Sequence, residues 1–131
     1  MSCLFCRIVA GEIPSRVVYA DDTAIAFLDI NPWHRGHTLV IPRRHVDDVV
    51  SDPAALPEIA PAIAATAKLL VEKLGCDGIN LLSNAGAVAG QEVFHLHVHI
   101  IPRYASSPGL RAMIGPDPAI DVDEVFAALR G

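Results

Sequence analysis

The chain has 131 residues, 52% of them hydrophobic, and a formal net charge of −5 at pH 7. This length predicts one domain, which we place at residues 1–131, and the composition predicts a folded core. The negative charge, without a run of Lys or Arg, excludes non-specific binding to a nucleic acid polymer. No apolar run reaches the roughly 20 residues that span a bilayer, and no basic segment precedes an apolar one at the N-terminus. We therefore expect a cytoplasmic protein with no membrane partner.

The three cysteines are an odd number, which argues against a disulfide framework in a cytoplasmic chain. Cys3 and Cys6 form a Cys-x-x-Cys pair that could be half of a metal site, a redox pair or two inert thiols. A redox pair normally opens a helix that follows a strand, and no strand precedes this pair. A closed zinc site needs four ligands. Since Cys76 stands alone, the missing two would have to be histidines, and metal binding is the interpretation that we favour.

The first half of the chain predicts a short helix over residues 7–11 and strands over 16–20 and 24–30, with a tight turn between the strands. Asp29 has an ordinary interpretation as a turn residue at the end of the second strand. The following loop places Trp33 and His34 on the surface.

The apolar run in residues 37–42 predicts a strand that is covered on both faces and stopped by Pro42. One helical turn should follow His45. A longer helix is expected over residues 54–74, in which Pro61 should cause a bend or a later start.

The last part of the chain predicts a strand over residues 79–83 and then a glycine-containing loop over 84–91. Gly86 and Gly90 let the backbone of this loop approach a ligand closely, so that amide groups can face an anion. Residues 104–118 lack a regular pattern. A short helix should end the chain, because Asp121 to Glu124 resemble a capping box before an apolar stripe.

Residues 93–101, Val-Phe-His-Leu-His-Val-His-Ile-Ile, alternate polar and apolar side chains, which predicts a half-buried strand. Three histidines should share one face, and the apolar side chains should point to a core on the other: Phe94, Leu96, Val98 and Ile100. His95 and His99 would lie about 13 Å apart, too far for one small ion to bind all three histidines. This pattern predicts a chemical site centred on His97, although a solvated surface or a His-x-His metal pair would also fit.

The segment His95-Leu-His97-Val-His99-Ile-Ile resembles the signature of the histidine triad family of nucleotide hydrolases and transferases. The resemblance extends over residues 3–103, and it is closest to the small nucleoside-phosphoramidate hydrolases with bacterial members. Further motifs fall in the family's order: Phe5, Gly11 to Pro14, Phe27 to Ile30, Gly36 to Pro42, and Asn84-x-Gly86 to Gln91.

This resemblance implies an α+β fold with a five-stranded antiparallel sheet, one long helix and one or more short helices. The core would be residues 3–103, followed by an irregular segment, 104–131, that ends in a short helix. The resemblance also implies a homodimer that forms a ten-stranded sheet.

The resemblance further implies a purine nucleotide pocket with an apolar base wall and a carboxylate, Asp29, for the ribose hydroxyls. The catalytic residues would be His97, His99, His37, Asn84 and Gln91. The nucleotide-binding residues would be Phe5, Ile8, Phe27, Asp29, Ile30, Asn84, Gln91, Glu92, Val93, His97 and His99. Members with an N-terminal Cys-x-x-Cys are expected to bind a structural zinc, here through Cys3, Cys6, His45 and His95, with no catalytic metal.

Chemistry supports the assignment of His97 as a nucleophile, because an imidazole with a pKa of about 6.5 is largely neutral at pH 7. We expect His97 to attack the α-phosphorus of a purine nucleoside phosphoramidate or related conjugate, and water then to release a nucleoside monophosphate. His99 and His37 would donate to phosphoryl oxygens. The alternatives are a dinucleoside polyphosphate hydrolase or phosphorylase, a metal-dependent hydrolase, and a non-catalytic nucleotide-binding regulatory module.

Overall fold

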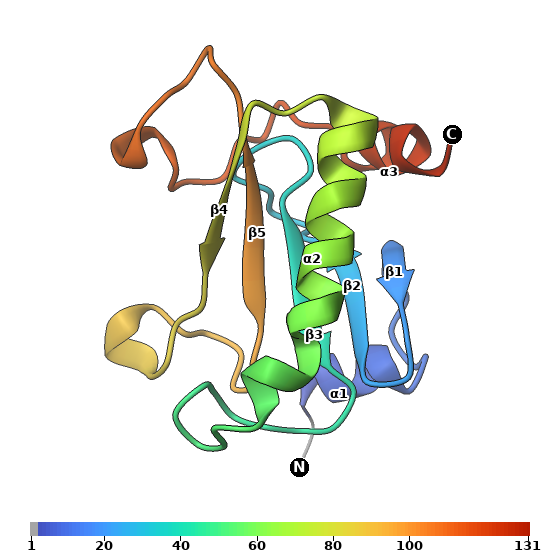
Figure 1. Ribbon diagram of the computed structural model, residues 1–131, viewed down its shortest axis with the longest axis vertical. Helices are drawn as coiled ribbons and strands as arrows, with labels where there is room; N and C mark the ends of the chain where they lie inside the picture. Colours follow the sequence, from blue (N-terminus) through green and yellow to red (C-terminus); the bar gives the residue numbers. More distant parts are fainter. Residues whose placement is uncertain (1–2) are drawn as a thin grey trace.

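A computed structural model describes residues 3–131 and shows one five-stranded antiparallel sheet in the order β1-β2-β3-β5-β4 (Figure 1). The strands are β1 (Val17–Ala20), β2 (Ala24–Leu28), β3 (Thr38–Pro42), β4 (Gly78–Leu82) and β5 (Val98–Arg103). The α-helices are α1 (Leu4–Val9), α2 (Ala55–Leu74) and α3 (Val122–Arg130), and two short 3₁₀ turns are η1 (Ala87–Ala89) and η2 (Leu110–Ala112). The expected α+β fold is confirmed.

Both faces of the central strands are buried, as the apolar run in residues 37–42 predicted. Since successive side chains of a strand point to opposite faces, Ala26 and Val40 pack toward α2, whereas Phe27 and Leu39 pack on the other face. This second face carries the smaller apolar cluster, which includes Phe5 of α1. The sheet is therefore covered by α2 on one side and by α1 on part of the other (Figure 1).

The long helix α2 lies against the sheet through an inner face of small and branched side chains, among them Ile59, Ile63 and Leu70. It begins at Ala55 and continues through Pro61, so the expected later start is wrong. The burial of the inner face holds the helix in place although Pro61 lacks a backbone donor. Gly75 ends the helix in the left-handed conformation, with φ of 64°.

The C-terminal helix α3 begins as predicted, because the Asp121 side chain accepts hydrogen bonds from the backbone amides of Asp123 and Glu124. Two ion pairs attach it to the N-terminal half of the chain. Arg16 contacts Asp123 at 2.7 Å, and Arg35 contacts Glu124 through both guanidinium NH₂ groups. As a result α3 lies beside the C-terminal end of α2 and close to β1 (Figure 1).

The expected strand over residues 93–101 is wrong at its start, because β5 begins only at Val98. Val98 pairs with Val40, so the same register would next join His97 to Ile41 and then Leu96 to Pro42. Pro42 has no N–H to donate, and the Leu96 amide instead bonds the carbonyl of Val46 at 2.6 Å. His95 and His97 therefore precede the strand.

Three further expectations differ from the structure. Phe94 is 48% exposed and does not reach the core, since the chain bends at this point. No helical turn follows His45, because the Asp48 side chain accepts from the amides of Val50 and Ser51 and closes a turn there. Helix α1 begins at Leu4 rather than at Arg7, with the Cys3 sulfur capping the Cys6 amide.

Among residues 3–131, no helix combines the length and the apolar character that crossing a membrane would require.

Candidate active site and metal centre

A cavity of about 470 Å³ opens on the face of the sheet opposite α2. Helix α1, the end of β2 and the loop before His97 surround it. Most of the residues expected to bind the nucleotide line it: Phe5, Ile8, Phe27, Asp29, Ile30, Asn84, Glu92, Val93, His97 and His99. Residues more than 90 positions apart in the sequence therefore line the same cavity.

Gly90 and Asn84 form one wall of this cavity. Gly90 has a φ of 105°, and a Cβ atom added to it would lie 3.4 Å from the Asn84 side-chain nitrogen. A larger residue would be strained there and would press on Asn84. Glycine thus allows the loop to pass close behind the amide side chain.

Backbone hydrogen bonding fixes the protonation of His97. Its Nδ1 lies 2.8 Å from the carbonyl oxygen of His95. Because a carbonyl can only accept, Nδ1 must carry the hydrogen, and in the neutral ring Nε2 keeps a lone pair. The Ser83 hydroxyl donates to the carbonyl of His97 at 2.8 Å and holds the backbone at this position. The side chain is 8% exposed and faces the cavity.

Burial keeps the histidines of the site neutral. Desolvation lowers the pKa of His97 from its ordinary value, although the bond to the His95 carbonyl acts in the opposite direction. Burial lowers the pKa of His37 to about 4 and that of His99 to about 3. Uncharged imidazoles therefore line this end of the cavity at neutral pH.

His37 does not reach the cavity, which contradicts the expectation that it donates to a phosphoryl oxygen. Its side chain is 1% exposed, and its Nε2 lies 2.8 Å from Nδ1 of His99. Its Nδ1 lies 3.0 Å from the backbone nitrogen of Trp33. With both ring nitrogens engaged, His37 can act on a ligand only through His99.

Gln91 also lies outside the cavity, because its amide is used within the loop. It accepts from the Gly86 amide at 2.8 Å and donates to the carbonyls of Asp47 and Val93. These bonds order the loop that carries Asn84 and Val93. The expected contact of Gln91 with a phosphate is therefore not supported by its position.

Several residues of the cavity were missed from the sequence, among them Trp33, Arg16 and Pro116. Trp33 was expected on the surface, yet its indole stacks on His99 with ring centroids 5.5 Å apart. Nothing in the local pattern around Trp33 or Pro116 indicates a site, since both are brought to it by tertiary packing. Trp33 lies three residues before the Gly36 to Pro42 motif of the resemblance, and this was the one available signal.

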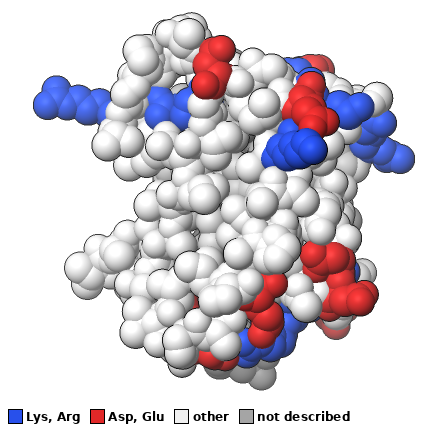
Figure 2. Space-filling view, in the orientation of Figure 1, with Lys and Arg blue, Asp and Glu red and all other residues white. Residues whose placement is uncertain are grey.

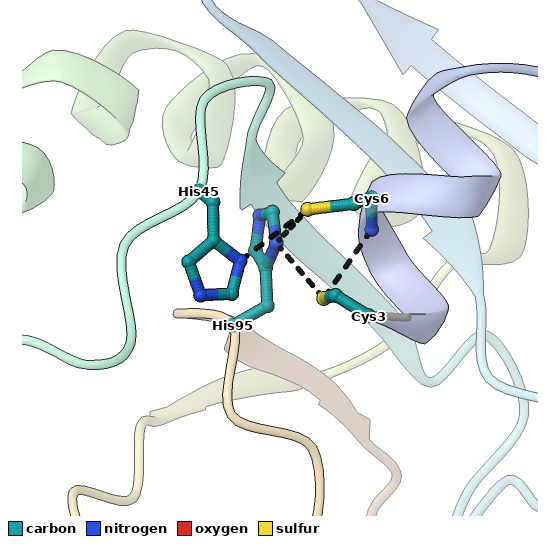
Figure 3. Close-up of side chains that lie close together, drawn as sticks. All are labelled: Cys3, Cys6, His45 and His95. Carbon is teal, nitrogen blue, oxygen red and sulfur yellow. Dashed lines mark hydrogen bonds between the residues drawn. The ribbon is translucent and has the colours of Figure 1, made fainter. Parts of the chain in front are cut away.

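Four candidate metal ligands converge beside the cavity, as Figure 3 shows. Cys3 and Cys6 come from the start of α1, His45 from the segment after β3, and His95 from the segment before β5. Their ligand atoms all lie within 4.8 Å of one another, and the three measured S···N separations are 3.3, 3.5 and 3.6 Å. A tetrahedral zinc ion would set each such separation at about 3.6 Å.

Hydrogen bonds also orient the two imidazoles for a cation. Nε2 of His95 donates to the carbonyl of Pro42 at 2.8 Å, and Nε2 of His45 donates to the Asp47 carboxylate at 2.8 Å. In each neutral ring the lone pair is therefore on Nδ1, the nitrogen that faces the sulfur atoms. A carbonyl or carboxylate behind a ligating histidine is the usual second contact of a metal site.

We expect the buried His37–His99 pair to make the protein less stable as the pH falls. Both pKa values lie below the ordinary 6.5, so the unfolded chain binds more protons between about pH 6.5 and pH 4. Stability should drop over this range by an amount on the order of 3 kcal/mol for each of the two histidines. Urea unfolding at several pH values measures it, and the difference from a H37N/H99N variant isolates the pair. Parallel pH curves for the two proteins would contradict this expectation.

Comparisons with known proteins identify the family. Residues 10–106 match the model of the HIT domain. An uncharacterized HIT-like protein of Methanocaldococcus jannaschii is 46% identical over 131 residues, which cover 98% of this chain and 99% of the relative. An adenylylsulfatase of Arabidopsis thaliana is 42% identical over 105 residues, 77% of this chain and 52% of that protein.

A solved structure agrees with these relatives. A zinc-bound histidine triad family protein from Mycobacterium smegmatis superimposes with a TM-score of 0.80 at 39% identity, covering 99% of this chain and 91% of that one. The matching family model, the identity over nearly the whole chain and the common fold lead to one conclusion: this chain belongs to the HIT, or histidine triad, family.

Proposed function

We propose that the protein hydrolyses or transfers the nucleotidyl group of purine nucleoside phosphoramidates, or of related nucleotidyl conjugates, through a covalent intermediate on His97. The observation that carries this proposal is the bond from His97 Nδ1 to the His95 carbonyl, which leaves the Nε2 lone pair free at the cavity. The adenylylsulfatase among the relatives supports a hydrolase that acts on a nucleotide conjugate.

The reaction has two displacements. In the first, Nε2 of His97 forms a bond to the α-phosphorus, while the bond to the amine or other leaving group breaks and the leaving group takes up a proton. In the second, water attacks the same phosphorus, the N–P bond breaks, and a nucleoside monophosphate leaves. Histidine suits both steps, because its neutral ring is nucleophilic and the resulting phosphoramidate is readily cleaved.

The remaining residues of the cavity hold the substrate. Phe5, Ile8, Phe27 and Ile30 would contact the base. Asp29 accepts from the Asn31 amide at 2.8 Å, and a carboxylate has further lone pairs for ribose hydroxyls. His99 would donate to a phosphoryl oxygen, supported from behind by His37. Asn84 would position the phosphate, and Gln91 would act through the loop.

A covalent adduct on His97 tests the mechanism. We expect adenosine 5′-phosphoramidate, followed by an alkaline quench, to leave one adenylyl group on His97 in peptide mass spectra. H97A should lower turnover by about 10⁴-fold or more, since the nucleophile is lost. H99N should keep the adduct but form it about 10²–10³-fold more slowly, because one charge-stabilising donor is removed.

Nucleotide binding by H97A, measured calorimetrically with adenosine monophosphate, shows that the variant is folded. An adduct on any other residue would refute the mechanism. Turnover that survives in H97A would point to a metal-activated water instead. Diadenosine polyphosphates used as parallel substrates test the dinucleoside polyphosphate alternative.

We also propose that Cys3, Cys6, His45 and His95 bind one structural zinc ion. The donor set fits zinc, since two thiols and two imidazole lone pairs face one point. Without a cation, burial and the neighbouring Cys3 thiol raise the pKa of Cys6, and a bound cation would favour the thiolate. The ion would attach the start of α1, and with it Phe5, to the segment before β5.

Tag-free protein should therefore contain about one zinc per chain by elemental analysis. The C3S/C6S variant should lose the metal and at least about 3 kcal/mol of stability, because metal binding contributes directly to folding free energy. C76S is the matched control, since Cys76 lies apart from the cluster and its loss should leave the zinc in place. A zinc-free wild-type protein of full stability would remove this proposal.

We further propose a homodimer in which β4 pairs with its counterpart to form a ten-stranded sheet. β4 is an edge strand, and Leu81 on it is 56% exposed. The centre of the surface over α2 and β4 carries few charged side chains (Figure 2). The outer residues of α2 there are apolar: Leu56, Pro57, Ala60, Pro61 and Ala64. An exposed strand edge beside an apolar surface favours association with a second copy.

A charge placed on this surface should disrupt the dimer. We expect wild-type protein to sediment as a dimer and A64R to sediment as a monomer, because the guanidinium would be buried without a partner. A127R, the same substitution on the exposed face of α3, should leave the dimer intact. A monomeric wild type, or equal effects of the two variants, would refute the proposed interface.

A further inference from the structure

Trp33 is the only tryptophan in the chain, and it lies directly against the histidines of the site. Its indole is nearly parallel to the ring of His99, with an interplanar angle of 9° and centroids 5.5 Å apart. The centroid of His37 is 5.0 Å from it. Trp33 also lines the cavity. The indole therefore covers one face of His99, which, like His97, belongs to the triad and faces the cavity.

The backbone amide of Trp33 determines the direction of the hydrogen bond between His37 and His99. It lies 3.0 Å from Nδ1 of His37 and can only donate, so this nitrogen must be an acceptor. The hydrogen of the neutral His37 ring is then on Nε2, which lies 2.8 Å from Nδ1 of His99 and donates to it. The hydrogen of His99 must in turn be on its own Nε2.

A charged His37 would break this series of hydrogen bonds from Trp33 to His99. An imidazolium carries a hydrogen on both nitrogens, and the one on Nδ1 would meet the Trp33 amide hydrogen. The Asp29 carboxylate, 3.7 Å from His37 Nε2, favours the charged ring, but burial outweighs it and lowers the pKa of His37 to about 4. His34 and His97 also favour the neutral form of His37, and His97 favours the neutral form of His99.

A metal ion is the other explanation for this cluster, because Asp29, His37 and His99 place their ligand atoms within 4.8 Å of one another. A cation on Nε2 of His37 would require the ring hydrogen to move to Nδ1, where the Trp33 amide already points its own hydrogen. The amide therefore opposes a cation here. The metal cluster at Cys3 and Cys6 differs, since its histidines donate to oxygen atoms from the nitrogen opposite the sulfur atoms.

The loop that carries Trp33 is held from the outside by the C-terminal segment. The Asp117 amide donates to the carbonyl of Pro32 at 2.8 Å, and His34 Nε2 lies 2.8 Å from the carbonyl of Ala112. At Gly36 the loop passes so close to α2 that an added Cβ would lie 2.5 Å from a methyl group of Leu74. These contacts fix the place from which the Trp33 amide donates.

We propose that Trp33 is a positioning residue, whose amide and indole together make His99 present an N–H, rather than a lone pair, to the phosphate. The amide sets the tautomers of His37 and His99, and the indole fixes the plane of His99 and keeps water from its face. The inference about the phosphate rests on the proposed function. The inference about the tautomers does not, because it follows from hydrogen bonding alone.

Nitrogen-15 NMR of histidine-labelled wild-type protein tests the tautomers at pH 7, through two-bond correlations between ring nitrogens and ring hydrogens. We expect both His37 and His99 to carry the hydrogen on Nε2. A hydrogen on Nδ1 of His37, or a charged ring, would overturn the proposal. Addition of zinc beyond the amount already bound should leave both signals unchanged, and a metal-induced shift of His37 would also overturn it.

Three substitutions test the role of the Trp33 amide and the role of its indole separately. W33F keeps both the amide and an aromatic face, and should leave the kcat for adenosine 5′-phosphoramidate within about threefold of wild type. W33A keeps the amide alone, so the tautomers should persist while kcat falls about tenfold with little change in KM. This loss is smaller than the 10²–10³-fold cost of removing a whole donor. W33P removes the amide and should produce a mixture of His37 tautomers.

The combined results distinguish the two proposals. If NMR shows the expected tautomers but the protein does not turn over the phosphoramidate, the proposed function is refuted and the role of the amide stands. Turnover with unchanged tautomers in a folded W33P would overturn the role of the amide. Equal kcat values for W33A and W33F would overturn the role of the indole. If W33P does not fold, the NMR of the wild-type protein decides.

Discussion

Backbone hydrogen-bonding groups decide what the histidines of this site can do. A neutral imidazole can carry its hydrogen on either nitrogen, so six histidines in one small chain allow many arrangements. The carbonyl of His95 holds the hydrogen of His97 on Nδ1, and the carbonyl of Pro42 holds that of His95 on Nε2. This leaves a lone pair on Nε2 of His97 at the cavity, as the proposed function requires, and one on Nδ1 of His95 beside the cysteines, as the proposed zinc site requires. The side chains are alike, and the hydrogen-bond acceptors behind them make them different.

His95 joins the candidate active site to the candidate metal centre. Its ring faces the cysteine sulfur atoms, while its backbone oxygen accepts the hydrogen of His97. Phe5 makes a second connection, since it lies between Cys3 and Cys6 in the sequence and its ring is 5.1 Å from the ring of His97. Because the two candidate sites share one residue and one helix, order at the cysteine–histidine cluster also orders His97.

The sequence was informative where a pattern has a local physical cause. The buried strands, the capped helix α3 and the histidine segment all depend on periodicity or on neighbouring side chains, and they could be predicted. The cluster of Cys3, Cys6, His45 and His95 and most of the cavity followed from the family resemblance. The position of Trp33, the burial of His37 and the internal use of Gln91 could not be predicted, because distant segments pack there. The start of β5 was missed because alternation continues past the point where pairing stops.

Pro42 has no backbone N–H, and this determines where the pairing of β3 with β5 stops. Had this position carried an N–H, the ladder could have continued to Leu96 and drawn the neighbouring residues into a regular strand. The carbonyl of Pro42 would then lie within the ladder instead of facing the ring of His95. An imino acid at this one place thus ends the pairing of β3 with β5, frees an acceptor for a side chain, and leaves His95 and His97 outside strand geometry. The change from regular sheet to the histidine segment of the site therefore depends on Pro42, a residue with no proposed role in the reaction.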